Sequence, residues 1–163
     1  MKNKIREVVY FICFSILSGI FMPIFANCDY HISASLSNFN KYITYTNVPR
    51  GLVLSVDSSV FFEQNDYEIK ENSKEFLDQI GEFIKLTDKP CVIEGNAKLN
   101  NNEDYTNWEI SIARAQKIAE YLITVHQLSP QKIRAIGFGS IMPENLTDRI
   151  DFVIINYEAG AGL

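Results

Sequence analysis

The chain has 163 residues, of which 47% are hydrophobic and 21% charged, and its formal net charge is -5 at pH 7. This length accommodates one ordinary domain and a tail, and the composition predicts a packed core. The acidic balance argues against a nucleic-acid partner, because proteins that bind nucleic acid present a basic face to the phosphates. We therefore expect one globular domain that does not bind nucleic acid.

The N-terminus has the layout of an export signal. A basic segment, MKNKIR, precedes an apolar run from Val8 to Ala26, and this order is typical of a signal peptide over residues 1–28. The run is longer than the ~7–15 residues of a usual signal core, so an uncleaved membrane anchor is an alternative. Pro23 favours the signal peptide, because proline interrupts a continuous helix.

A third alternative is lipidation at Cys28. The segment Phe25-Ala26-Asn27-Cys28 resembles a bacterial lipobox, although Asn27 replaces the Gly, Ala or Ser that is usual before the cysteine. Without acylation, Cys28 is a plain thiol or pairs with Cys91. Cys91 begins an apolar run, which favours a buried and inert thiol. All three alternatives place the rest of the chain outside the cytoplasm, tethered to the outer or inner membrane or exported.

Residues 29–49 are rich in Ser, Asn and Tyr and show no sustained period, so we interpret them as a tether ahead of the domain that ends in a short extended piece. The domain begins with a strand in which Leu52, Leu54 and Val56 alternate with their neighbours. A loop with the aromatic pair Phe61-Phe62 follows, and we expect this pair to lie under the next helix.

The apolar spacing predicts a first helix that begins after Asn72 or Ser73 and ends before Thr87, ahead of Pro90. A short buried strand follows at about residues 91–95.

A second helix is predicted from about Trp108 to Val125, with Thr106 or Asn107 as its N-cap. Strands are predicted at residues 132–139 and 150–155.

The order of these elements is β-α-β-α-β-β. Helical crossovers between strands imply partly parallel pairing, so we predict an α/β (α+β) two-layer sandwich. Its mixed four-stranded sheet carries two main helices on one face. The domain is expected to span residues 50–158, and residues 159–163 to fray.

Motifs for catalysis and metal binding are missing from the sequence. There is no HExxH, paired CxxC, GxSxG or P-loop. The two histidines, His31 and His126, are far apart, and Ser111 lies inside a predicted helix without a base beside it. We therefore predict a protein that is not an enzyme and has no cofactor or metal.

Two segments carry a family signature. The segment TNWEISIARA, residues 106–115, is similar to S-N-W-E-L-S-x-x-R-A, and KIRAIGFG, residues 132–139, is similar to R-I-x-x-x-G-Y-G. With these motifs, the run from about residue 50 to 155 resembles the OmpA-like C-terminal domain in its MotB-type version. The resemblance implies a periplasmic domain that binds the diaminopimelate of peptidoglycan non-covalently. In the family a carboxylate meets the ligand's amine and an arginine meets a ligand carboxylate.

The resemblance places the family's arginine at Arg114 and its helix-opening asparagine at Asn107. The family's G-H-T-D turn corresponds to Gly95-Asn96-Ala97-Lys98, so Lys98 replaces the aspartate. The later N-R-R-V corresponds to Thr147-Asp148-Arg149-Ile150, in which the asparagine and the first arginine are lost and Arg149 is kept.

Lys98 reverses the charge at the amine-binding position. A like-charge contact at ~4 Å costs on the order of 4 kcal/mol at an effective dielectric of about 20, before relaxation. The lost carboxylate removes another ~2–5 kcal/mol if the pair is desolvated. We therefore expect a degenerate peptidoglycan pocket, formed by resemblance from Arg114, Asn107, Lys98, Gly95, Asn96 and Arg149.

Two alternatives stay open for this pocket. In the first alternative, Glu103 or Asp104 supplies the missing carboxylate. Glu94 is not expected to do so, because it precedes the turn and should point elsewhere. Alternatively, Arg114 has no ligand role and pairs with Asp104, Glu109 or Glu120, or is a charge on the helix surface.

The preferred interpretation is a structural or tethering component of a bacterial cell-envelope assembly, for example a secretion system. By length and layout the chain resembles the DotK/IcmN-like lipoproteins of type IVB secretion systems. The expected partners are subunits of that complex and a membrane. The alternative is a functional non-covalent peptidoglycan anchor.

Overall fold

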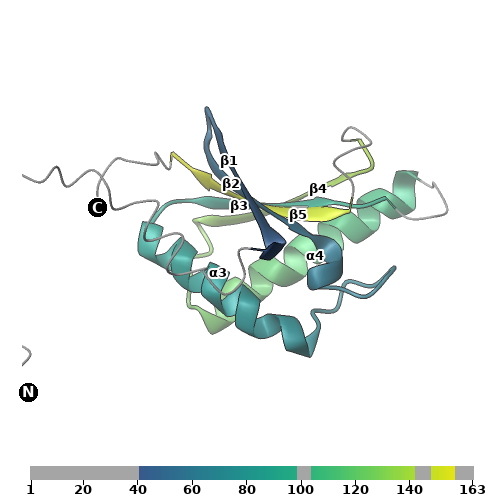
Figure 1. Ribbon diagram of the computed structural model, residues 1–163, viewed down its shortest axis with the longest axis horizontal. Coiled ribbons are helices and arrows are strands. Elements are labelled where there is room, and N and C mark those ends of the chain that lie inside the picture. The colour runs from purple at the N-terminus through teal and green to yellow at the C-terminus, as the bar shows by residue number, and fades with distance from the viewer. Residues whose placement is uncertain (1–40, 99–103, 142–147, 157–163) are drawn as a thin grey trace, which may run out of the picture.

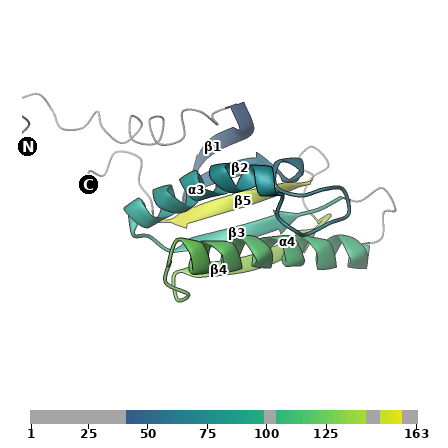
Figure 2. The ribbon, with the colours of Figure 1, turned by 90° about the horizontal axis from the view of Figure 1, so that it is seen from below.

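The computed structural model describes residues 41–98, 104–141 and 148–156. Within these ranges five strands form one sheet in the order β1-β2-β5-β3-β4, and two long helices lie side by side on one of its faces (Figures 1 and 2). The elements are β1 (Ile43–Val48), β2 (Gly51–Asp57), the 3-10 turns η3 (Ser58–Val60) and η4 (Glu71–Ser73), α3 (Lys74–Thr87), β3 (Cys91–Asn96), α4 (Asp104–Val125), β4 (Ile133–Gly139) and β5 (Arg149–Ile155).

The pairing of the strands is mixed, as the sequence predicts. β3 and β4 are parallel because α4 forms the crossover between them. β5 lies between β2 and β3 and is antiparallel to both. The two-layer fold and the placement of both helices on one face are therefore confirmed.

The sheet has one strand more than the four predicted, because the end of the predicted tether is β1. It pairs antiparallel with β2 through a two-residue turn at Pro49 and Arg50, with Val48 opposite Gly51. Ile43 and Tyr45 contact the core, whereas Thr44 and Thr46 point to the other face. The ordered sheet therefore starts upstream of the expected boundary at residue 50.

α3 begins where it was predicted, after Ser73, whereas α4 begins earlier than predicted. α4 starts at Asp104, so Thr106 and Asn107 lie inside the helix and neither is its N-cap. Ser73 is the N-cap residue of α3, but its hydroxyl donates to the carbonyl of Lys70 at 2.7 Å instead of capping the helix. α3 ends at Thr87, where Asp88 adopts a left-handed conformation with φ of 53°.

The core lies between the sheet and the two helices. Phe61 and Phe62 are buried there, as predicted, and Phe61 stacks on Phe76 with ring centroids 5.5 Å apart. Phe152 of β5 meets Phe61 edge-on at 6.1 Å. Burying each of these rings stabilises the fold by about 1.5–3 kcal/mol. The aromatic cluster thus joins the loop after β2 to α3 and to the centre of the sheet.

None of the helices formed by the described residues is both long and apolar enough to span a bilayer. The predicted export signal, the anchor and the lipidation site at Cys28 all lie outside the described residues. The tail at residues 159–163 and the histidine at position 31 do so as well.

Cys91 is a free, fully buried thiol at the start of β3, which confirms the predicted buried state. Burial raises the pKa of this thiol from 9.0 to about 12. Because the thiolate is the nucleophile, we expect the folded thiol to react with DTNB at pH 8 about 1,000-fold more slowly than the unfolded one. Residues 29–163 contain no other cysteine, so in this fragment every reaction with DTNB comes from Cys91. Equal rates with and without urea would contradict the burial of Cys91.

Candidate functional site

Two glycines allow α4 to lie directly on the parallel strands. Gly95 of β3 and Gly137 of β4 are register partners. A Cβ added to Gly95 would lie 2.0 Å from the carbonyl oxygen of Ser111, and one added to Gly137 would lie 2.6 Å from the backbone nitrogen of Ile112. Gly95, which the resemblance assigned to a ligand-binding turn, is therefore a packing contact for the helix.

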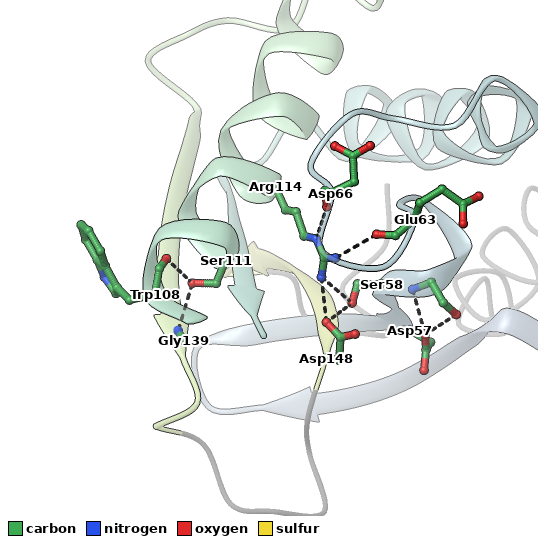
Figure 3. Close-up of polar contacts among 10 residues, drawn as sticks. Asp57, Ser58, Glu63, Asp66, Trp108, Ser111, Arg114, Gly139 and Asp148 are labelled. Atoms are coloured by element: carbon green, nitrogen blue, oxygen red, sulfur yellow. Dashed lines mark hydrogen bonds and ion pairs between the residues drawn. The ribbon is translucent and has the colours of Figure 1, made fainter. Parts of the chain in front are cut away.

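The hydroxyl of Ser111 fixes α4 to the end of β4. It accepts a hydrogen bond from the backbone nitrogen of Gly139 at 2.9 Å and donates to the carbonyl of Trp108 at 2.8 Å (Figure 3). Ser111 is completely buried. Arg114 follows one helical turn later and points away from the strands toward the loop after β2 (Figure 3).

Arg114 is a buried arginine, with 2% of its surface exposed. Its Nε donates to the carbonyl of Asp66 at 2.7 Å, and its Nη2 donates to the carbonyl of Glu63 at 3.2 Å. The guanidinium also lies over the ring of Phe62, 5.2 Å from its centroid. One side of the guanidinium is therefore used to hold the loop at residues 62–66.

The acidic partner of Arg114 is Asp148, just before β5. Nη1 of Arg114 donates to Oδ1 of Asp148 at 2.7 Å, and the same oxygen accepts from the hydroxyl of Ser58 at 2.6 Å (Figure 3). The backbone nitrogen of Ser58 donates to the carbonyl of Asp148 at 2.9 Å. Asp148, which stands at the position of the first arginine in the family's N-R-R-V, therefore neutralises Arg114.

Two of the three partners predicted for Arg114, Glu109 and Glu120, are wrong. Glu109 and Glu120 are exposed on α4, and no ion pair joins either to Arg114 among the described residues. The side chain of Asp104 lies outside the described residues. Arg114 is also not the helix-surface charge that was the other alternative, because the loop after β2 covers it.

A cavity of about 340 Å³ lies beside this ion pair. Lys98 lines it from the end of β3, and Lys70 lines it from the opposite loop, where its Nζ bonds the carbonyl of Ser59 at 2.8 Å and Glu63 at 3.1 Å. Lys98 itself is exposed, and it makes no ion pair with another described residue. The lining residues are Ser59, Phe62, Glu63, Gln64, Asn65, Lys70, Lys98, Arg114 and Asp148.

Two further residues expected at the site lie on the other face of the sheet. Asn96 donates from Nδ2 to Oδ2 of Asp151 at 3.4 Å, and Nε of Arg149 bonds the same carboxylate at 2.9 and 3.0 Å. Residues 91 and 93 face the core, so residues 94 and 96 of the same strand point away from the helices. Neither Asn96 nor Arg149 lines the cavity with Arg114.

Glu94 and Asn107 are buried and also do not line the cavity. Glu94 points elsewhere, as predicted: its two oxygens accept from Nη1 and Nη2 of Arg50 at 2.7 and 2.9 Å. Glu103 lies outside the described residues. Of the six residues assigned by resemblance, the structure thus brings only Arg114 and Lys98 to one cavity.

His126, which follows directly after α4, contacts two carboxylates in the middle of α3. Nε2 lies 2.8 Å from Oδ1 of Asp78, and Nδ1 lies 3.1 Å from Oε1 of Glu82. The hydroxyl of Tyr121 donates to the same oxygen of Asp78 at 2.8 Å. Among the described residues no group of three or more His, Cys, Asp or Glu side chains is arranged to hold a metal ion.

Sequence reasoning missed Asp148 and Ser58. Asp148 is separated from Arg114 by 34 positions, and only the insertion of β5 beside β2 brings them together. The sequence did contain one signal of this pairing, which is that two family positions change charge together. Asp148 stands in place of the first arginine of N-R-R-V, and Lys98 stands in place of the aspartate of G-H-T-D.

The fold is shared with solved structures of bacterial envelope proteins. An outer membrane protein from Borrelia burgdorferi B31 superimposes with a TM-score of 0.61 and 25% identity, over 72% of this chain and 100% of that one. A putative MotB-like protein from Desulfovibrio vulgaris gives 0.67 and 19%, over 80% and 90%. The cell wall anchor of the type VI secretion system from Pseudomonas aeruginosa gives 0.65 and 14%, over 76% and 95%.

The chain belongs to the OmpA family, whose model matches residues 61–151. It is also similar to two proteins of Bacillus subtilis strain 168. The uncharacterized protein YtxE is 27% identical over 97 residues, which cover 58% of this chain and 40% of YtxE. Motility protein B is 25% identical over 97 residues, 57% of this chain and 37% of that protein. The chain thus matches about two-fifths of the length of each relative.

Proposed function

We propose that the chain is a non-catalytic periplasmic component of a cell-envelope assembly, for example a secretion system, in which its OmpA-family domain has a structural or tethering role. Membership of the OmpA family supports this role, as does the shared fold with a cell wall anchor of a secretion system. The N-terminal segment supplies the link to a membrane, as a lipid at Cys28 or as an uncleaved anchor.

Within this role, the peptidoglycan pocket is degenerate. The observation that carries this proposal is the internal ion pair between Arg114 and Asp148, 2.7 Å long and on a side chain only 2% exposed. A ligand carboxylate would have to displace Asp148 from the arginine. Lys98 lines the same cavity where the family's aspartate would meet an amine. Both halves of the family's recognition are therefore opposed by charge.

The alternative is a working peptidoglycan anchor, and one observation favours it. Asp148 brings a carboxylate to the cavity and is 41% exposed, so an acidic group is present although the turn has lost its own. In this alternative Asp148 takes over the contact with the ligand's amine, and Arg114 holds Asp148 in place.

Sedimentation with insoluble peptidoglycan distinguishes the two functions. We expect the fragment 29–163 to stay in the supernatant. The double variant Lys98→Asp/Asp148→Asn should pellet saturably, with affinity at least about tenfold above the parent, because it restores an acid in the turn and removes the charge that competes for Arg114.

The matched control is Lys98→Gln/Asp148→Asn, which removes both opposing charges without restoring the acid and should not pellet. Circular dichroism establishes that each variant is folded. Saturable pelleting of the parent that is lost in Asp148→Asn would overturn the degenerate pocket and support the anchor.

A further inference from the structure

We propose that the outer edge of β4, together with the side of α4 above it, is the interface of a symmetric dimer. In this dimer β4 pairs antiparallel with β4 of a second copy about Ala135, so that two five-stranded sheets join into one continuous sheet. The inference goes beyond the proposed function and does not involve the cavity beside Arg114.

β4 is an edge strand, because within the described residues it pairs with β3 alone (Figure 2). The backbone nitrogen of Cys91 donates to the carbonyl of Lys132 at 2.8 Å, so the even-numbered residues of this segment direct their backbone groups to β3. Ile133, Ala135 and Gly137 therefore direct theirs to the outer edge. β4 also contains neither proline nor lysine, which commonly protect an exposed edge against pairing with another chain.

A largely apolar stripe of α4 lies above this edge. Ile112 lies on β4, because a Cβ added to Gly137 would be 2.7 Å from the Cβ of Ile112. The residues that follow this side of α4 at helical spacing are Trp108, Ile112, Gln116, Ala119 and Ile123. Tyr121, on the other side of the helix, donates to Asp78 of α3. The stripe therefore faces away from α3, with Trp108 46% exposed and both isoleucines half-buried.

The position of α4 over the sheet suits a twofold axis beside β4. Gly95 of β3 and Gly137 of β4 both contact α4, so the helix axis lies above the line between the two strands. With strands about 4.8 Å apart, antiparallel pairing of two β4 strands would place the two α4 axes about 9.6 Å apart, which is two strand spacings. Packed helices lie about 8–10 Å apart. Strand pairing and helix packing are therefore compatible in one dimer.

Pairing about Ala135 satisfies the strand layer. The outward-facing residues then meet one another, with Ala135 opposite its own copy and Ile133 opposite Gly137 of the second copy. On the face of the sheet away from the helices, the exposed Arg134 lies opposite Ile136 of the second copy, which is 40% exposed. No like charges meet across the pair, and an apolar side chain is covered on each side.

The helix layer has its centre at the same level. Gly137 lies under Ile112, and α4 runs antiparallel to β4 because it is the crossover between parallel strands. Two strand residues advance about 6.6 Å and four helix residues about 6 Å. Ala135 therefore lies level with Gln116, which is the middle of the stripe.

The stripe is self-complementary about Gln116. Antiparallel stripes centred there place Trp108 opposite Ile123 of the second copy, and Ile112 opposite the smaller Ala119. Gln116 is exposed and would meet its own copy on the axis, where each amide has a donor and an acceptor for the other. This agreement between two layers favours a second copy of the chain over an unrelated partner.

The test is sedimentation equilibrium of the full chain in density-matched detergent, which measures the dissociation constant of the dimer. We expect a monomer–dimer equilibrium in the parent. Ile136→Lys places a second cation opposite each Arg134 and should raise Kd at least about tenfold, whereas Arg134→Glu/Ile136→Lys restores opposite charges and should return Kd to within about threefold of the parent. Ala135→Pro removes an outward N–H, which a monomeric edge strand tolerates, and should abolish the dimer. The matched control is Thr46→Lys on the exposed edge of β1, which should leave Kd unchanged.

Thermal melts establish that each variant is folded. A parent that stays monomeric at every concentration would overturn the inference, since the edge would then fit a partner other than a second copy. So would a dimer whose Kd is the same in Ile136→Lys and Ala135→Pro, or one that Thr46→Lys weakens as much as Ile136→Lys does. Failure of Arg134→Glu to rescue Ile136→Lys would overturn the pairing about Ala135. None of these results alters the sedimentation with peptidoglycan, so the proposed function stands or falls separately.

Discussion

Replacing Arg114 by alanine should lower the free energy of unfolding by about 3–5 kcal/mol, because one buried side chain supplies donors to four oxygens. The hydroxyl of Ser58 and the two loop carbonyls would each lose a partner in a region with little access to water. Asp148 would lose its counter-charge, but its partial exposure lets it rehydrate. Urea denaturation followed by circular dichroism measures the change.

Two substitutions separate the bonds of Arg114 from its charge. Asp148→Asn keeps an oxygen acceptor for the guanidinium and should cost only about 1 kcal/mol, since the pair is partly exposed. Arg114→Lys keeps the charge but cannot span the oxygens, so it should be nearly as damaging as alanine. An unfolding midpoint for Arg114→Ala equal to that of the parent would show that the loop does not depend on this residue.

Gly95→Ala should destabilise the fold by about 3 kcal/mol, because the added methyl group would lie 2.0 Å from the carbonyl oxygen of Ser111. The obstructing atom belongs to the backbone of α4, so the helix must move away from β3 to relieve the contact. That shift would also disturb the hydrogen bond from Gly139 to the Ser111 hydroxyl. Thermal and urea denaturation of the purified variant measure the effect.

Gly81→Ala is the matched control. Its methyl group would lie 2.6 Å from Cδ2 of His126, which belongs to a side chain rather than to backbone. Adding His126→Ala should therefore remove this clash and restore the stability lost in Gly81→Ala. The alanine itself also favours the helix by about 1 kcal/mol relative to glycine. The same second substitution should give no relief to Gly95→Ala. A melting temperature of Gly95→Ala equal to that of the parent would show that α4 does not lie against β3 at Gly95.

The strands and helices of the core were predictable because their apolar residues repeat with the period of the element. β1 was predicted only as a short extended piece and not as a strand of the sheet, because ITYTNV is an edge strand with one residue, Ile43, buried, and its Ser- and Asn-rich neighbours favour a loop. The start of α4 was missed because the residues before Trp108 are polar and carry no apolar stripe.

The candidate site was less predictable than the fold. The resemblance predicted that Arg114 and Lys98 lie at one site, and both line the cavity. The ion pair with Asp148 was not visible, because it joins α4 to the start of β5 and depends on tertiary structure. Asn96 and Arg149 were expected at the same site, yet the period of two in a strand turns Asn96 to the opposite face of the sheet.

The first and the last strand of the described fold hold different positions in the sheet, one at its edge and one in its interior. The N-terminal side leads into β1, an edge strand bonded to β2 alone, whereas the C-terminal side leaves from β5, which is bonded to strands on both sides. Mechanical load carried by a membrane tether would reach the domain through β1, at the Ile43–Val56 pair. Because β1 is paired on one side only, a pull on its N-terminal end would have to break the β1–β2 pairing alone before it reached the other four strands.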